Sequence, residues 1–220
     1  SFVAILAALL AVGAFLTTCG GDGGGGSDGP VVVDTTVFGR VLSAFDETPL
    51  EGVTVTAAEA QGSASTDELG RFILPLPAAG TYALTASLDG HTYAQRWTEA
   101  ADKELVSVPD MFLTPLDPKE IVIGPEGGRD TNSDGRIEID VPAGALDETV
   151  SMRATGVERG KHLPNFLPEA SHFTYACELT PDGQQFSTPV ALRMRNERGF
   201  SAGTPIPVGV YSPETLEWTH

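Results

Sequence analysis

The feature that most constrains this chain is that no stretch keeps a sustained helical period of 3.6 residues. Short runs with apolar and polar residues in alternation recur instead, which is the pattern of half-buried strands. The 25 Gly and 16 Pro fall largely between these runs and supply the turns. Strands are therefore predicted in the first half at 37–42, 53–56, 72–74 and 82–86, and in the second at 121–123, 137–141, 152–155, 173–179, 190–194 and 208–211. We expect an all-β chain built from two β-sandwich modules in tandem.

Charge and cysteine content exclude several classes of function. Lys and Arg number 13 against 30 Asp and Glu, so the net charge is −17 and the protein repels a phosphate backbone. We expect no nucleic-acid partner. The two cysteines, Cys19 and Cys177, cannot build a disulfide framework or a four-cysteine zinc site.

The N-terminal stretch has the pattern of an export signal. Residues 2–16 are uncharged and almost entirely apolar, but fewer than the roughly 20 residues that cross a membrane as a helix. We expect residues 1–18 to be a signal peptide that is truncated at its start, because no initiating Met or basic region precedes the apolar run.

The sequence Leu16-Thr17-Thr18-Cys19-Gly20 resembles the lipobox of bacterial lipoproteins. The resemblance implies that Cys19 is the lipid attachment site and becomes the acylated N-terminus, which makes the membrane a partner. It places the protein in the bacterial cell envelope, at the outer membrane or the cell surface. Residues 19–30 would be the lipidated cysteine and a Gly-rich linker. The Gly pattern within this linker lacks the flanking strand and helix of a dinucleotide site, so no such cofactor is expected.

The first module, residues 31–115, contains four characteristic segments: Gly39-Arg40-Val41, residues 49–55, residues 66–72 and residues 79–84. Together they resemble the carboxypeptidase regulatory-like domain of transthyretin-like fold. The resemblance implies a seven-stranded β-sandwich that is not catalytic and whose relatives bind carbohydrate.

A short stretch of the first module offers candidate glycan contacts. His91, Tyr93 and Trp97 could line a sugar platform. The alternative is a single strand in which Tyr93 faces the core and Trp97 lies at a sheet edge.

Residues 116–118 follow Pro115 and end with Pro118, and they are predicted to be an extended linker to a second module at 119–220. Gly124-Pro125-Glu126-Gly127-Gly128, residues 141–146 and residues 179–186 resemble the ZU-type domain of zonula occludens proteins and netrin receptors. The resemblance implies an Ig-like β-sandwich used for protein interaction, with no catalytic residues. We expect this module to be incomplete at its C-terminal end, because the sequence stops just after Trp218.

Several residues of the second module could bind a metal. Asp130, Asn132 and Asp134 match the first half of an EF-hand loop, but position twelve is Val141 instead of a bidentate Glu. The segment is therefore either a weak calcium site or the polar tip of a hairpin.

Two histidines and a cysteine are further candidate functional groups. His162 and His172 flank a Pro-rich loop and could meet as metal ligands, although loop histidines are usually solvated. Cys177 is predicted to pack in the core, because it alternates with apolar residues.

No catalytic motif is found, and we do not expect an enzyme. The predicted function is that of a non-enzymatic surface lipoprotein, or the N-terminal stalk of a larger secreted protein, that presents or binds a protein or glycan partner. The alternatives are a carbohydrate-binding surface protein and the accessory region of an enzyme whose catalytic domain lies beyond His220.

Overall fold

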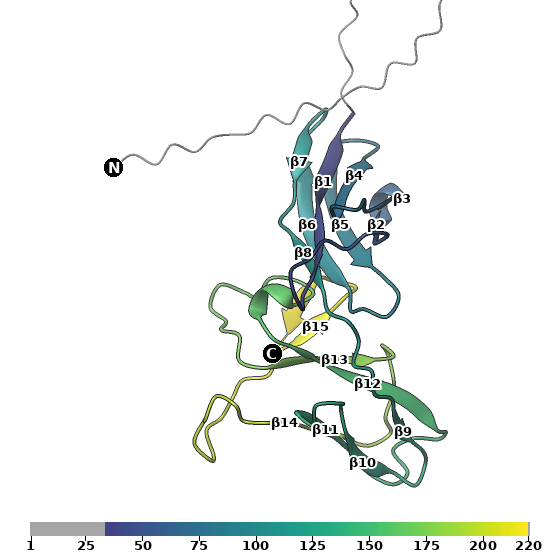
Figure 1. Cartoon of the computed structure of the whole chain (residues 1–220), viewed down its shortest axis with the longest axis vertical. Helices are drawn as coiled ribbons and strands as arrows, with labels where there is room; N and C mark the ends of the chain where they lie inside the picture. The colour runs from purple at the N-terminus through teal and green to yellow at the C-terminus, as the bar shows by residue number, and fades with distance from the viewer. Residues whose placement is uncertain (1–33, 220) are drawn as a thin grey trace, which may run out of the picture. The chain divides into compact units, whose positions relative to one another are not determined.

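The computed structural model describes residues 34–219. Almost all regular structure in these residues is β-strand; the exceptions are two 3-10 turns, η1 (Ala58–Ala60) and η2 (Gly160–His162). The prediction of an all-β chain with two β-sandwich modules is confirmed, and Figure 1 labels the strands β1 to β15. The predicted signal peptide and the Gly-rich linker up to residue 30 lie outside the described residues.

The first module contains two facing sheets. Its strands are β1 (Thr36–Ser43), β2 (Thr54–Ala57), β3 (Gly62–Ser65), β4 (Arg71–Pro75), β5 (Gly80–Ser87), β6 (Ala94–Ala100), β7 (Leu105–Ser107) and β8 (Met111–Leu113). One sheet has the order β3-β2-β5-β6, and β1 pairs with β4, β7 and β8 in the other. Both β7 and β8 run parallel to β1, one beside its first half and one beside its second. They occupy one strand position, so the sandwich has the seven positions implied by the family resemblance.

The alternating sequence explains the core of this module. Val37 and Val41 of β1, Val55 of β2, Phe72 of β4 and Leu84 of β5 are all almost fully buried between the sheets. Because side chains alternate across a strand, the intervening residues face outward.

One turn of the first module requires glycine. Gly70 has φ +69°, and a Cβ atom there would lie 2.4 Å from the carbonyl oxygen of Val41. Only glycine combines this backbone angle with so close an approach.

The second module is a smaller sandwich of two three-stranded sheets. Its strands are β9 (Ile121–Ile123), β10 (Gly128–Thr131), β11 (Ile137–Val141), β12 (Val150–Val157), β13 (Ala176–Thr180) and β14 (Ala191–Met194). The orders are β10-β11-β14 and β13-β12-β9, and all pairs are antiparallel. The core between them is formed by Ile121, Ile139, Val141 and Met152. A separate hairpin follows, made of β15 (Val210–Ser212) and β16 (Glu217–Thr219).

The predicted strands are all present, with small differences at their ends. The strands at 121–123 and 137–141 have the predicted bounds. The strand expected at 173–179 begins only at Ala176. The sequence pattern did not predict β3, β7, β8, β10 or β16, and it offered β6 only as the alternative to a sugar platform.

Candidate functional site

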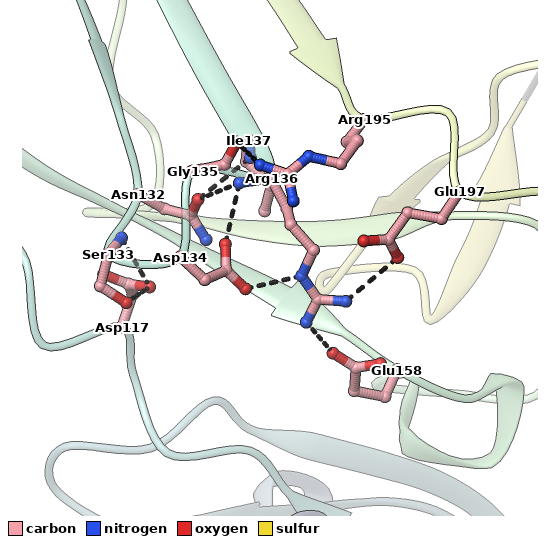
Figure 2. Close-up of polar contacts among 10 residues, drawn as sticks. All are labelled: Asp117, Asn132, Ser133, Asp134, Gly135, Arg136, Ile137, Glu158, Arg195 and Glu197. Carbon is pink, nitrogen blue, oxygen red and sulfur yellow. Dashed lines mark hydrogen bonds and ion pairs between the residues drawn. The ribbon is translucent and has the colours of Figure 1, made fainter.

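The predicted calcium loop forms the tip of the hairpin between β10 and β11, and its oxygens bond to the protein itself (Figure 2). The Asn132 Oδ1 accepts hydrogen bonds from the backbone N–H groups of Arg136 and Ile137, each at 3.0 Å. The Asp134 carboxylate accepts the backbone N–H of Arg136 at 2.9 Å and its Nε at 2.6 Å. Asp130 pairs with the Lys119 ammonium at 2.6 Å.

These contacts set the charge of the loop. The hydrogen bond from Lys119 lowers the pKa of Asp130. Burial raises the pKa of Asp134, but the hydrogen bonds from Arg136 outweigh it and the net pKa is lowered. Both carboxylates are therefore ionised and already paired, so a calcium ion would have to compete with Arg136 and Lys119. Calcium binding stays a prediction. Within residues 34–219, no group of three or more His, Cys, Asp or Glu side chains is placed to hold a metal.

The predicted linker contributes a residue to this loop that sequence reasoning missed. Asp117 is buried, and its carboxylate accepts the backbone N–H and the hydroxyl of Ser133, the latter at 2.7 Å. Its own backbone N–H donates to Thr155 Oγ1 at 2.9 Å. Leu116 meanwhile bonds through its N–H to the carbonyl oxygen of Gly90 in the first module. The segment between the modules is thus hydrogen-bonded to both. The sequence feature that could have predicted this contact is the position of Asp117 directly before Pro118, because Asp side chains often accept backbone hydrogen bonds in turns.

The glycan candidates lie on or just before β6, but in different surroundings. Trp97 is 47% exposed on the outer face of the sheet, opposite Ala83 of β5. Tyr93 is half-buried, and burial raises the pKa of its hydroxyl, with a further contribution from the nearby Glu178 carboxylate of the second module. His91 bonds to the carbonyl oxygen of Asp89. Of the three, Trp97 presents a broad exposed ring.

Strand β6 is also where the first module contacts the second. The Gln95 N–H donates to the Pro164 carbonyl oxygen at 2.7 Å, and its side-chain oxygen accepts the Tyr211 hydroxyl at 2.8 Å. Arg96 is only 2% exposed; its guanidinium also donates to Pro164 O, at 2.9 Å, and stacks on Phe166 at 4.4 Å. Burial lowers the pKa of Arg96 to about 10. No described carboxylate pairs with this buried guanidinium, which donates only to carbonyl oxygens.

Two further contacts join the first module to the second. Glu47 of the first module pairs with Arg159 at 3.1 Å and with Lys161 at 2.7 Å. The ring of His162 packs on Phe112 of β8 with centroids 5.1 Å apart. Burial, followed by the charges of Lys161 and Arg159, lowers the pKa of His162, so it is neutral at pH 7. We call the contacts of Glu47, Gln95, Arg96 and Phe112 with the second module the junction.

The remaining candidate residues are placed apart. His162 lies in the junction, whereas His172 is exposed on the loop before β13. Cys177 packs against the core of the second module as predicted, and burial raises the pKa of its thiol to about 12. Cys19 lies outside the described residues. In residues 34–219, no helix is both long enough and apolar enough to cross a membrane.

Residues 36–109 match the carboxypeptidase regulatory-like domain family, which confirms the resemblance for the first module. The match covers about a third of the chain. A search of curated proteins gave no match.

Three solved structures show a remote likeness. A type II cohesin–X-dockerin complex of Acetivibrio cellulolyticus is 22% identical over 38% of this chain and 59% of that chain, with a TM-score of 0.33. A streptococcal ancillary pilin is 14% identical over 56% of this chain and 59% of that one, with a TM-score of 0.32. The TIE protein of Bacillus anthracis is 12% identical over 53% and 30%, with a TM-score of 0.31. The chain thus spans about three fifths of the first matched structure, and we base no conclusion on likenesses this remote.

Proposed function

We propose that this chain is a non-enzymatic, exported surface protein in which two β-sandwiches act as one rigid spacer, attached to a membrane by a lipid at Cys19. The junction is the observation that carries the proposal. Domains that move independently are joined by exposed, flexible linkers, and few contacts cross between them. Here the linker itself is hydrogen-bonded, and a guanidinium lies buried under the loop of the other module.

The energetics of Arg96 explain why the junction favours one arrangement. A charged group that loses water must regain hydrogen bonds from the protein, or its burial costs several kcal/mol. Arg96 regains them partly from the Pro164 carbonyl of the second module. Separation of the modules would remove that acceptor together with the Phe166 ring that covers the guanidinium. The two sandwiches are therefore expected to unfold and move together.

Glycan binding is the second candidate function, and the exposure of Trp97 supports it. Its ring lies on a sheet beside the small Ala83 side chain, which leaves the indole accessible to a flat sugar face. Tyr93 is half-buried and lies near the Glu178 carboxylate of the second module, so the platform would centre on Trp97 alone.

The spacer proposal is tested by calorimetry and the anchor by labelling. A rigid spacer gives one cooperative unfolding transition whose van't Hoff and calorimetric enthalpies agree. Two separate transitions would contradict it.

For the anchor, cells that express the chain are fed labelled fatty acid. The label should enter the protein and be absent from Cys19→Ala. Label that persists in this variant would refute the anchor and leave the spacer untouched.

A further inference from the structure

A pocket of about 180 Å³ opens at one end of the second module, beside the β10–β11 hairpin tip. Four segments far apart in the sequence line it: the hairpin tip, the end of β12, the stretch before β13 and the turn after β14. Its apolar lining comes from Ile137, Gly156, Val157, Ala176 and Met194. The volume is below the roughly 300–1,000 Å³ of sites for drug-sized ligands, and suits one small ring.

The pocket concentrates cations that have no carboxylate partner. Most Lys and Arg residues in this acidic chain form an ion pair; among residues 34–219 the exceptions are Arg96, Lys103, Arg195 and Arg198. Arg96 is buried in the junction, and Lys103 lies in the first module. Arg195 and Arg198 both line the pocket. Arg195 donates through Nη2 to the Gly135 carbonyl oxygen at 3.1 Å, and most of the other N–H groups of the two guanidiniums are left for an anionic ligand.

Aromatic rings hold one of these arginines in place. The Arg198 guanidinium carbon lies 5.8 Å from the ring centroids of both Phe173 and Tyr175, and its Nε donates to the Thr174 carbonyl oxygen at 2.8 Å. The backbone N–H of Arg198 donates to the Tyr175 hydroxyl at 2.6 Å. The turn after β14 is therefore fixed against the pocket wall, and the guanidinium is oriented before any ligand binds.

Acidic groups on the rim limit which anion fits. Arg136 pairs with Asp134, Glu158 and Glu197 (Figure 2), and these three carboxylates line the same pocket as the unpaired arginines. A multiply charged phosphate would be repelled by them. A ligand with one carboxylate and several hydroxyls can bind both the arginines and the carboxylates of the pocket. Arginine binds a carboxylate through two parallel hydrogen bonds, and the rim carboxylates accept hydrogen bonds from hydroxyl groups.

We propose that this pocket binds one unit of an acidic sugar, a uronate. Its carboxylate pairs with Arg195 and Arg198, its hydroxyls bond to the rim carboxylates, and its apolar ring face lies on the Phe173 and Tyr175 wall. A compact pocket of this size accepts a ring more readily than an extended peptide. The site lies in the other module from Trp97 and does not depend on the rigidity of the junction.

The test is titration of the full chain with trigalacturonate, followed by calorimetry and by NMR of the aromatic protons. The matched probe is the trimethyl ester, which has the same rings without the charges. We expect the acid to bind and to shift the Phe173 and Tyr175 signals, and the ester to do neither. Arg195→Gln and Arg198→Gln should each weaken binding about tenfold, the range of one charge-assisted hydrogen bond. Lys103→Gln, which removes an exposed unpaired cation elsewhere, should leave binding unchanged.

Several results would overturn the proposal. They are no binding at millimolar trigalacturonate, equal binding of the ester, or unchanged affinity in both arginine variants. Equal binding of triglutamate would show a site for acidic peptides instead of sugars. Thermal melts of each variant establish that it is folded, and the aromatic NMR shifts report the site independently of the substitutions.

Discussion

The carboxyl group of Glu178 should make the stability of this protein depend on pH near neutrality. Glu178 lies on β13 opposite Thr155, where it is half-buried. Burial is the main cause that raises its pKa from 4.5 to about 7, and the neighbouring Asp182 carboxylate adds to it. A carboxyl group whose pKa is raised by folding destabilises the folded state wherever it must ionise.

The size and sign of the effect follow from the two pKa values. A rise from 4.5 to about 7 corresponds to at most about 3 kcal/mol. Because the side chain keeps some contact with water, we expect about 1–2 kcal/mol. The penalty is absent below pH 4.5, grows as the pH rises from 4.5 to 7, and is complete above pH 7. Removal of the charge by Glu178→Gln should therefore stabilise the protein by about that amount at pH 8, and by an amount that falls toward zero near pH 4.5.

Urea unfolding of the parent and of Glu178→Gln over this pH range measures the effect directly. Glu169→Gln is the matched control, because Glu169 lies exposed on the loop before β13 of the same module. It should change the free energy of unfolding little at any pH. An equal gain from Glu178→Gln at both ends of the range, or a loss at pH 8, would refute the reasoning.

Four other predictions test separate parts of the structure. Tyr211→Phe removes the hydroxyl that bonds to Gln95 and should lower the free energy of unfolding by about 1 kcal/mol; no change would mean that this bond does not stabilise the junction. Gly70→Ala should cost at least about 2 kcal/mol more than Gly52→Ala, since both have positive φ but only Gly70 approaches another backbone atom; equal losses in urea unfolding would contradict the close approach. If the hairpin tip binds calcium, millimolar Ca²⁺ should raise the melting temperature of the parent and leave Asp134→Ala unaffected, and a parent that does not respond rejects the site. Glycan retention on an array should be lost in Trp97→Ala, and unchanged retention would end that hypothesis.

The strand cores could be predicted because their pattern is local. The stretch Ile137-Glu138-Ile139-Asp140-Val141 alternates strictly and became β11 with the predicted bounds. By contrast, β3 has the sequence Gly-Ser-Ala-Ser, which has no residue type that favours strands, and β10 has the sequence Gly-Arg-Asp-Thr, in which only Thr131 does. They are strands because β2 and β11 offer them hydrogen-bonding edges, which is a tertiary effect.

The sites were less predictable, since they depend on residues that are distant in the chain. Asp130, Asn132 and Asp134 were found from their spacing, but their engagement by Lys119 and Arg136 is visible only in the fold. An arginine in the middle of a strand is normally solvent-exposed. Nothing near Arg96 in the sequence indicates that Pro164 and Phe166 cover its guanidinium. The uronate pocket likewise joins segments that no local pattern connects.

The claim that the two sandwiches form one rigid spacer is tested most directly by backbone ¹⁵N relaxation of the described residues. If the junction keeps the two modules together, the relaxation rates of amides in both modules fit a single rotational diffusion tensor for the parent protein at physiological salt. Separate, shorter correlation times for the two modules would show that they tumble independently, and would contradict the account.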